Sequence, residues 1–239
     1  MDLKLEDVAE LLNVSEKTVL RWISESKIPY YLLRQQYRFS RSEIENWVLS
    51  CKQSGVELSA FSEEESTDKE ALGMHHYGLY RAIHKGGVYA NIPGETKEEV
   101  IQNAMKLIAH DLRLDANVIT ELLLDRESLM PTSLSHGIGV PHTRDFLLEE
   151  SFDVVAVVFP ENPIEYGALD GEPVHTLFFL FACDDKRHLH LLAKLAHLSS
   201  KSDNRQFFRS HPTKAQLLDH IKHWESHLKM QSPKVPASV

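Results

Sequence analysis

Val154-Val155-Ala156-Val157-Val158-Phe159 is a continuous apolar run, and Thr176-Leu177-Phe178-Phe179-Leu180-Phe181-Ala182 is a second one. Uninterrupted runs of this kind are typical of strands that are covered on both faces of a sheet. A further short strand is expected over 88–91, and apolar stripes at helical spacing predict helices over 96–112, 116–126, 186–199, 204–209 and 213–227. The alternation of strands and helices predicts an α/β domain over residues 77–228, with a mixed sheet flanked by helices.

The N-terminal part, residues 1–52, has a different pattern. Leu5, Val8, Ala9 and Leu12 follow helical spacing, and we expect the amphipathic start at Met1–Glu6 to be helical too. Ser15 then stands as an N-cap before a second helix that we expect Pro29 to stop. Two short strands over 30–33 and 37–39 form a wing, and a last helix follows Ser40 with Ile44, Trp47 and Val48 on one face. This pattern predicts a small winged helix-turn-helix domain.

Composition limits the class of protein. The chain has 239 residues, 42% of them hydrophobic, and a net charge of -9, which argues against a globally basic nucleic-acid coat. It has only two cysteines, Cys51 and Cys183, so no disulfide framework is available, and no apolar run predicts membrane insertion. We therefore expect a cytoplasmic protein. The acidic stretch 53–76 is expected to be a linker, and 229–239 a flexible tail.

The N-terminal pattern resembles the excisionase-like or MerR-like helix-turn-helix. The resemblance covers about residues 3–50 and rests on Ala9 where the helices cross, Asn13 at the position that tolerates left-handed backbone, the β-branched Val19, and Tyr37-Arg38-Phe39 at the end of the wing. Asn13 stands where the family usually has glycine, and asparagine adopts that backbone more readily than most residues.

This resemblance implies DNA binding. The second helix would enter the major groove and the wing would contact phosphates, which makes the candidate DNA-contacting residues Glu16, Lys17, Thr18, Arg21, Arg34 and Arg38. Residues 1–60 contain eight Lys and Arg against nine Asp and Glu, a balance of -1. Because DNA-binding domains usually carry a net positive charge, a protein-protein interaction module stays open as an alternative.

A second motif, Gly137-Ile138-Gly139-Val140-Pro141-His142-Thr143-Arg144, lies between the predicted elements. Ile138 and Val140 alternate as in a strand, and Pro141 ends its ladder pairing. We therefore expect the imidazole of His142 to be displayed at a sheet edge rather than buried. A neutral imidazole is a competent nucleophile near neutral pH.

This motif resembles the active site of the type-2 enzyme IIA domain of the phosphoenolpyruvate-dependent sugar phosphotransferase system (PTS), of the fructose, mannitol and nitrogen-regulatory type. The resemblance extends over about residues 77–228 and includes the Leu-Leu-Asp-Arg-Glu stretch at 123–127, Ile164, and the stretches 169–174 and 188–196. It implies that His142 accepts a phosphoryl group, through Nε2 in the family, from a small phosphohistidine carrier protein of the HPr or NPr type. It also implies that His188 and Arg126 complete the site.

Both implied roles make physical sense. An N-cap at Asp184 or Asp185 would put His188 in the first turn of a helix, where exposed N–H groups favour an incoming phosphate. The guanidinium of Arg126 would supply a permanent positive charge and paired N–H donors for the phosphoryl oxygens. No cofactor and no metal is expected, because donor and acceptor are both imidazoles; His220, His223 and His227 share a helix face but lack a fourth ligand.

Thr143 departs from the family, which usually has a small residue directly after the histidine. Two consequences stay open: Thr143 hydrogen-bonds the phosphoryl oxygens, or it slows transfer.

The preferred hypothesis is a PTS-linked regulator in which phosphorylation of His142 is coupled to binding of DNA or of a partner protein. The alternative is a soluble IIA phosphoryl carrier that serves a sugar permease through a separate IIB partner. A weaker third hypothesis is a protein-interaction adaptor that has lost DNA binding. In each case the chain is a phosphoryl carrier or binding protein rather than an enzyme that turns over small molecules. We also expect a homodimer, since one helix-turn-helix buries only about 600–1,000 Å² on DNA.

Overall fold

The computed structural model describes residues 3–12, 14–50, 78–143 and 152–230. The N-terminal part contains three helices and a two-stranded antiparallel sheet: α1 (Leu5–Leu12), α2 (Glu16–Ser24), β1 (Tyr31–Leu33), β2 (Gln36–Arg38) and α3 (Arg41–Ser50). Val8, Val19, Trp22, Ile44 and Val48 are buried between the helices. The winged helix-turn-helix predicted from the sequence is confirmed.

Local chemistry explains the turn between α1 and α2. The side chain of Ser15 accepts a hydrogen bond from the backbone N–H of Thr18 at 3.1 Å, so Ser15 is the predicted N-cap. The N–H of Val14 donates to the carbonyl of Ala9, which ends α1 in a tight turn. Asn13, which the sequence pattern assigns to left-handed backbone, lies outside the described residues.

Three details of this part differ from the prediction. Leu3 and Lys4 are not helical, because the backbone of Leu3 pairs instead with that of Phe39 at 2.9 Å in both directions, and Met1 and Asp2 lie outside the described residues. Helix α2 ends at Ser24, well before Pro29, because Ser26 adopts a left-handed backbone with φ of 54°. The wing turn is also tighter than expected: Arg34 and Gln35 both have positive φ, 50° and 64°, as in the primed two-residue turns of hairpins.

The larger part is an α/β domain with a four-stranded mixed sheet in the order β3-β5-β6-β4. Strand β3 is parallel to β5, β5 is antiparallel to β6, and β4 is parallel to β6. Its elements are α5 (Gly78–Gly86), β3 (Val88–Ile92), α6 (Lys97–Leu112), α7 (Ala116–Leu129), β4 (Ile138–Gly139), β5 (Val154–Pro160), β6 (Thr176–Phe181), α8 (Asp185–Ser200), α9 (Ser202–Arg209) and α10 (Lys214–Met230). The predicted fold class is therefore confirmed.

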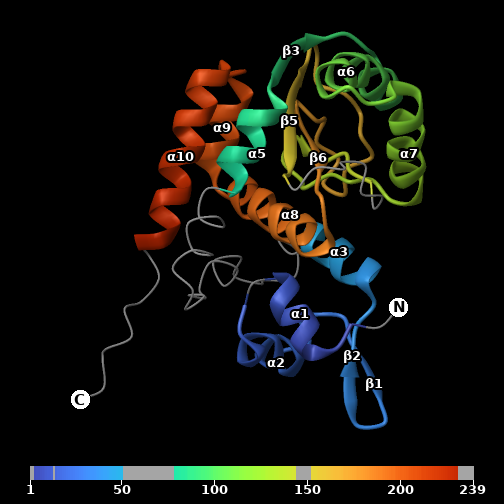
Figure 1. Cartoon of the computed structure of the whole chain (residues 1–239), viewed down its shortest axis with the longest axis vertical. Coiled ribbons are helices and arrows are strands. Elements are labelled where there is room, and N and C mark those ends of the chain that lie inside the picture. Colours follow the sequence, from blue (N-terminus) through green and yellow to red (C-terminus); the bar gives the residue numbers. More distant parts are fainter. Residues whose placement is uncertain (1–2, 13, 51–77, 144–151, 231–239) are drawn as a thin grey trace.

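The two central strands are buried along their whole length. Alternate side chains face opposite layers, so Val155, Val157 and Phe159 join the cluster under α5, α8 and α10, whereas Val154, Ala156 and Val158 join the cluster under α6 and α7. The helices cover both faces of the sheet in Figure 1. This double cover explains why the two strands are apolar without alternation.

Most predicted elements are present with their ends shifted by one to three residues, but α5 was not predicted. It packs closely on β5: a Cβ atom added at Gly86 would lie 2.3 Å from the carbonyl oxygen of Val155. Among the described residues, none of the helices combines the length and the apolar character needed to cross a membrane.

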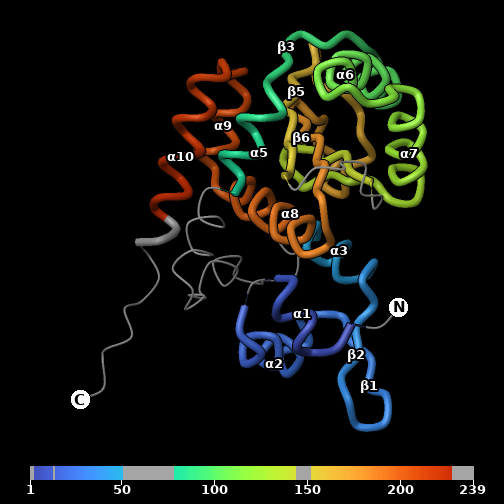
Figure 2. The backbone as a smooth tube through the Cα atoms, in the orientation of Figure 1, coloured from blue at the N-terminus to red at the C-terminus, as the bar shows by residue number. Residues whose placement is uncertain are grey.

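The helix-turn-helix part lies directly against the α/β domain. Helices α1 and α3 pack on α8, as the cartoon and the tube both show (Figures 1 and 2). Buried residues of the two parts form one continuous hydrophobic cluster. Two ion pairs flank it: Lys186 Nζ lies 2.8 Å from Glu10 Oε1, and Arg41 pairs with Asp185. Helix α3 therefore lies at the end of the sheet where β4 stops.

Candidate functional site

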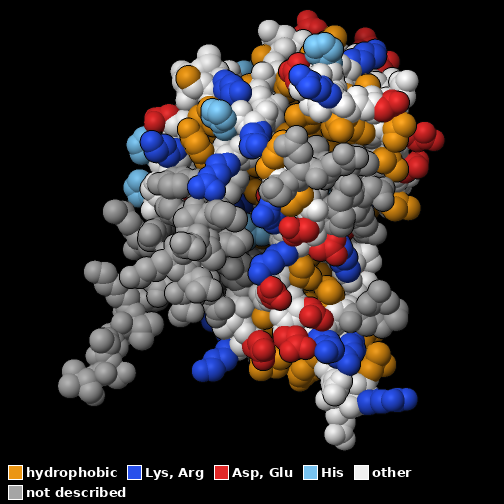
Figure 3. All heavy atoms as spheres, in the orientation of Figure 1, with side chains coloured by type: hydrophobic (Ala, Val, Ile, Leu, Met, Phe, Trp, Pro, Cys, Tyr) orange, Lys and Arg blue, Asp and Glu red, His pale blue; other side chains and the backbone are white. Residues whose placement is uncertain are grey.

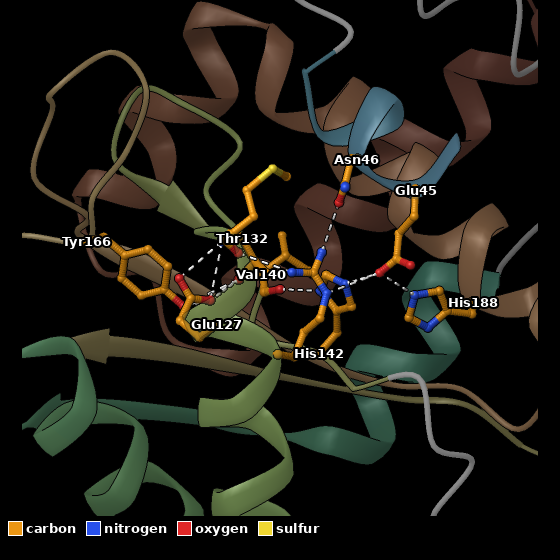
Figure 4. Close-up of polar contacts among 10 residues, drawn as sticks. Glu45, Asn46, Glu127, Thr132, Val140, His142, Tyr166 and His188 are labelled. Carbon is orange, nitrogen blue, oxygen red and sulfur yellow. Dashed lines mark hydrogen bonds and ion pairs between the residues drawn. The ribbon is translucent and has the colours of Figure 1, made fainter. Parts of the chain in front are cut away.

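His142 lies just beyond the edge strand β4 and pairs by a single bridge with Leu180 of β6. Its Nδ1 is 2.6 Å from the carbonyl oxygen of Val140, which can only accept, so Nδ1 carries a hydrogen and donates it. This bond fixes the orientation of the ring and directs Nε2 away from the sheet (Figure 4). The edge position predicted for His142 is correct.

The prediction that His142 is displayed to solvent is wrong, because its side chain is completely buried. The group that covers it is Glu45 of α3, whose Oε1 lies 2.6 Å from Nε2 of His142. Glu45 is itself fully buried. Figure 4 shows the Glu45 carboxylate entering the site from the helix-turn-helix side, between His142 and His188.

His188 is the second histidine of this site. It lies near the start of α8, where the side chain of Asp184 accepts a hydrogen bond from the N–H of Arg187 at 2.9 Å, so the predicted N-cap is confirmed. The rings of His188 and His142 have centroids 5.1 Å apart, and His188 Nε2 is 3.9 Å from Glu45 Oε1. Burial lowers the pKa of His188, although the nearby carboxylate opposes this shift. Its buried setting therefore favours the neutral ring.

Arg126 comes from the last turn of α7 and is also buried. Its Nη1 donates to the carbonyl of Met130 at 3.1 Å, its Nη2 donates to Asn46 Oδ1 at 3.2 Å, and its Nε is 3.5 Å from Glu45 Oε1. The structure thus brings together His142, His188 and Arg126, as the sequence predicted. It adds two consecutive residues of α3, Glu45 and Asn46, that the sequence analysis did not assign to the site.

The protonation of the cluster follows from its contacts. Burial by itself would raise the pKa of Glu45, but hydrogen bonds and charges from His142 and His188 outweigh burial and hold this pKa far below its usual range. Glu45 is therefore an ionised acceptor. Since Nδ1 of His142 faces a carbonyl and Nε2 faces this carboxylate, both ring nitrogens donate. In this arrangement both ring nitrogens of His142 are engaged by acceptors, so Nε2 has no lone pair to offer.

A second buried cluster supports the strand that leads to His142. The carboxylate of Glu127 accepts hydrogen bonds from the N–H and the hydroxyl of Thr132, at 3.1 and 2.6 Å, and from the hydroxyl of Tyr166 at 3.1 Å. The carbonyl of Thr132 in turn accepts from the N–H of Val140 at 2.8 Å. Burial raises the pKa of Glu127. These bonds position Val140, whose carbonyl orients His142 (Figure 4).

Thr143 is buried beside His142. Arg144, the last residue of the motif, lies outside the described residues. Neither of the two consequences considered for Thr143 is decided by its burial.

The candidate DNA-contacting residues lie on other surfaces. Lys17, Arg21 and Arg34 are exposed on α2 and the wing turn, whereas Thr18 and Arg38 are half-buried. Thr18 hydrogen-bonds the capping Ser15, and Arg38 donates to Gln36 at 2.8 Å. On the face shown in Figure 3, basic side chains are interspersed with acidic ones rather than gathered in one patch.

Two clusters within the described residues have ligand atoms close enough together for a metal ion: Glu45, His142 and His188, and also His136, Asp170 and Glu172. The second group lies at the surface. In the first group the guanidinium of Arg126 lies 3.5 Å from the carboxylate, so its charge opposes a cation there. The same charge favours an anion.

Comparisons with known proteins identify the family of this chain. The family model described as "Phosphoenolpyruvate-dependent sugar phosphotransferase system, EIIA 2" matches residues 82–224, and a model described as "Helix-turn-helix domain" matches residues 3–52. Since the first match spans more than half of the chain, the chain belongs to the EIIA 2 family of the phosphotransferase system. The resemblances seen in the sequence are confirmed. Family membership supports a role as a phosphoryl carrier or regulator in that system.

Individual relatives point the same way. The "Nitrogen regulatory protein" of Pseudomonas aeruginosa is 35% identical over 138 residues, which cover 56% of this chain and 88% of that protein. The protein of the same name from Escherichia coli is 35% identical over 105 residues, which cover 43% of this chain and 63% of that protein. Among solved structures, "Nitrogen Regulatory Protein IIA-Ntr from Neisseria meningitidis" matches with a TM-score of 0.54 at 22% identity, over 60% of this chain and 98% of that one. This last likeness shows the fold.

Proposed function

We propose that this chain is a regulator of the phosphotransferase system in which His142 accepts a phosphoryl group from a phosphohistidine carrier and thereby changes what the helix-turn-helix part binds. The observation that carries the proposal is the contact between the two parts: α3 of the helix-turn-helix inserts Glu45 at the histidine of the IIA domain. A passive carrier for a permease has no need of this contact. The nitrogen regulatory relatives support the regulatory branch of the family.

In the proposed reaction Nε2 of neutral His142 attacks the phosphorus of the carrier's phosphohistidine. The N–P bond of the carrier breaks, and its electron pair stays on the carrier nitrogen. If the carrier's ring is protonated on its second nitrogen, it leaves as neutral imidazole and His142 becomes a phosphoimidazolium that keeps Nδ1–H on Val140. Charge and protons then balance without an outside acid.

The other site residues stabilise the transferring group. Arg126 is the permanent positive charge for oxygens of a loose, charge-spread transition state, and neutral His188 donates one N–H. Thr143 completes the set that we assign to the site. Loss of a donor such as His188 should slow transfer without removing the nucleophile. A cofactor has no part in this reaction.

For the regulatory output we propose DNA as the target, contacted through Lys17, Thr18, Arg21, Arg34 and Arg38. A homodimer would present two such modules to neighbouring half-sites. Couplings between sites usually lie near 1–3 kcal/mol, so phosphorylation should change the DNA affinity about 5- to 150-fold.

The test of acceptance uses the full chain with phosphoenolpyruvate, enzyme I and the carrier, followed by intact mass. We expect a gain of one phosphoryl mass that disappears in His142→Ala and persists in His110→Ala, a histidine exposed on α6. Labelling that survives His142→Ala would refute the assignment.

The test of output is a titration of both forms against DNA selected from a genomic fragment library, at fixed salt. Equal affinities would refute the coupling, and light scattering on the same samples measures the expected dimer.

A further inference from the structure

The carboxylate of Glu45 occupies the place where a phosphoryl group on His142 would have to be. Its Oε1 is 2.6 Å from Nε2, with no exposed surface on either side chain. A phosphorus atom bonded to Nε2 needs that same space. The phosphorylated site and the site seen here therefore cannot coexist.

Helix α3 places a carboxylate and an amide oxygen among the groups of the site that would bind an anion. His142 donates to Glu45, His188 lies 3.9 Å from the same oxygen, and Arg126 lies 3.5 Å from it. Asn46 accepts a further hydrogen bond from Arg126 at 3.2 Å. His142, His188 and Arg126 thus all lie within 4 Å of the Glu45 carboxylate. Glu45 and Asn46 therefore occupy the position that a phosphoryl group on His142 would take.

The contact around the site is broad enough to hold Glu45 and Asn46 in place. Both α1 and α3 pack on α8, and the apolar side chains of the two parts form a single buried cluster. The ion pairs Lys186–Glu10 and Arg41–Asp185 flank the histidine His188 on α8. The face that a carrier must reach to touch His142 is therefore covered.

We propose that the face of the IIA domain around His142 is a docking surface with two mutually exclusive occupants, the chain's own helices α1 and α3 and the phosphohistidine carrier, so that the helix-turn-helix part must undock before His142 is phosphorylated. This inference rests on the proposed function. It adds the identity of the internal ligand, Glu45, and the order of events.

The docked form also disables the nucleophile chemically. With Glu45 in place, both nitrogens of His142 donate hydrogen bonds, so Nε2 has no lone pair for attack. The proposed attack needs the lone pair of Nε2, so the carboxylate has to withdraw before the transfer. Once phosphorylated, the site carries up to about two negative charges and repels the returning carboxylate. The phosphorylated chain is therefore the undocked one.

The docked contact leaves the DNA-facing elements outside. The exposed residues of α2 and the wing lie on elements that extend away from the α/β domain (Figure 1). The contact thus controls access to His142 directly, whereas it controls DNA binding only by fixing where the helix-turn-helix is held.

The first test measures the rate of phosphoryl uptake in the full chain. If the docked form holds about 90–99% of the population, it slows uptake about 10- to 100-fold, and Glu45→Ala, which removes the carboxylate but leaves the apolar contact, shortens that delay. Glu43→Gln is the matched control on the same helix: its carboxylate accepts a hydrogen bond from the hydroxyl of Tyr31 on the wing. We expect the control to react at the wild-type rate. Equal rates for Glu45→Ala and wild type would overturn the proposal.

The second test measures docking independently of phosphorylation. It uses fluorescence resonance energy transfer between one dye on α2 and another on α6. Lys186→Glu and Glu10→Lys should each lower the transfer signal, and the double variant should restore it by exchanging the two charges. Phosphorylated wild type should show the undocked signal. A signal that stays at the docked value after phosphorylation would overturn the proposal.

The two tests separate this inference from the function on which it rests. If no variant takes up phosphate, the proposed function fails, whatever the dyes report. If wild type and Glu45→Ala are labelled equally fast, the function stands and the internal ligand is wrong. If mixing dye-labelled copies produces transfer between chains, the occupant is α3 of a second copy and the intramolecular form of the proposal is overturned.

Discussion

Glu225 of α10 is a single buried carboxylate that joins three helices, and its removal should weaken the IIA domain strongly. Its two oxygens accept hydrogen bonds from the N–H groups of Leu79 and Tyr80, each at 3.1 Å. These groups lie at the N-terminus of α5, where amides have no partner within the helix. Lys194 of α8 also donates to it, at 2.6 Å. Glu225 has only 1% of its surface exposed. The change Glu225→Ala therefore deprives two helix-terminal amides and one ammonium of this carboxylate.

The magnitude follows from these contacts. A hydrogen bond to a charged group contributes about 1.5–3 kcal/mol, and breaking a buried ion pair by removing one partner costs about 3–5 kcal/mol. Because one carboxylate makes all of these contacts, the values overlap and do not add. We expect Glu225→Ala to lower the free energy of unfolding by about 3–5 kcal/mol. At roughly 2–4 °C per kcal/mol for a domain of this size, Tm should fall by about 6–20 °C.

The assay is calorimetry of the full chain together with urea unfolding followed by circular dichroism. Glu225→Gln should cost less, because an amide oxygen still accepts from α5 while the ion pair is lost. Asp219→Ala, which removes an exposed carboxylate from the same helix, serves as the control and should cost less than about 1 kcal/mol. A loss below about 1 kcal/mol in Glu225→Ala would refute the assignment of this carboxylate as the link between the three helices.

Three further outcomes are expected. Gly86→Ala should destabilise the chain by about 1–3 kcal/mol in urea unfolding, because the new Cβ would lie 2.3 Å from the carbonyl oxygen of Val155, and an unchanged midpoint would contradict this close packing. Burial lowers the pKa of His197 to about 4 from 6.5, so the folded chain favours the neutral ring. The resulting contribution to stability is complete above pH 6.5 and is lost as the pH falls toward 4. His197→Phe should remove up to about 3 kcal/mol of this pH dependence between those two pH values. Arg21→Ala should weaken DNA binding and reduce the salt slope by about 1, whereas Lys106→Ala on the exposed face of α6 should leave both unchanged.

Much of the fold could be predicted because its signals are local. The runs at 154–159 and 176–182 indicate doubly covered strands whatever the rest of the chain does, since the covering layers are implied by the absence of polar side chains. The caps at Ser15 and Asp184 depend only on residues three positions away. Helix α5 was missed even though Leu79, Ala82 and Ile83 have helical spacing, because glycines at both of its ends read as a loop.

The burial of His142 could not be predicted in the same way. Its partner, Glu45, lies 97 residues earlier in the chain, and a carboxylate on a short helix is usually a solvated surface residue. One clue was present. Apolar Leu49 lies on a different side of α3 from Ile44, Trp47 and Val48, and all four are buried. A helix that is apolar on more than one side indicates a second covering surface, which here is α8.

This second covering surface decides how a signal can pass between the two parts. Helix α3 is shared, because one side of it closes the helix-turn-helix core while Glu45 and Asn46 enter the IIA site. In the proposed regulator, a phosphoryl group on His142 would displace the adjacent Glu45 directly, whereas its electrostatic effect on DNA beyond the Debye length of about 8 Å would be largely screened. The proposed coupling would therefore run through the position of α3. Since α3 packs within the helix-turn-helix core, we expect its withdrawal to move α2 and the wing with it as one body.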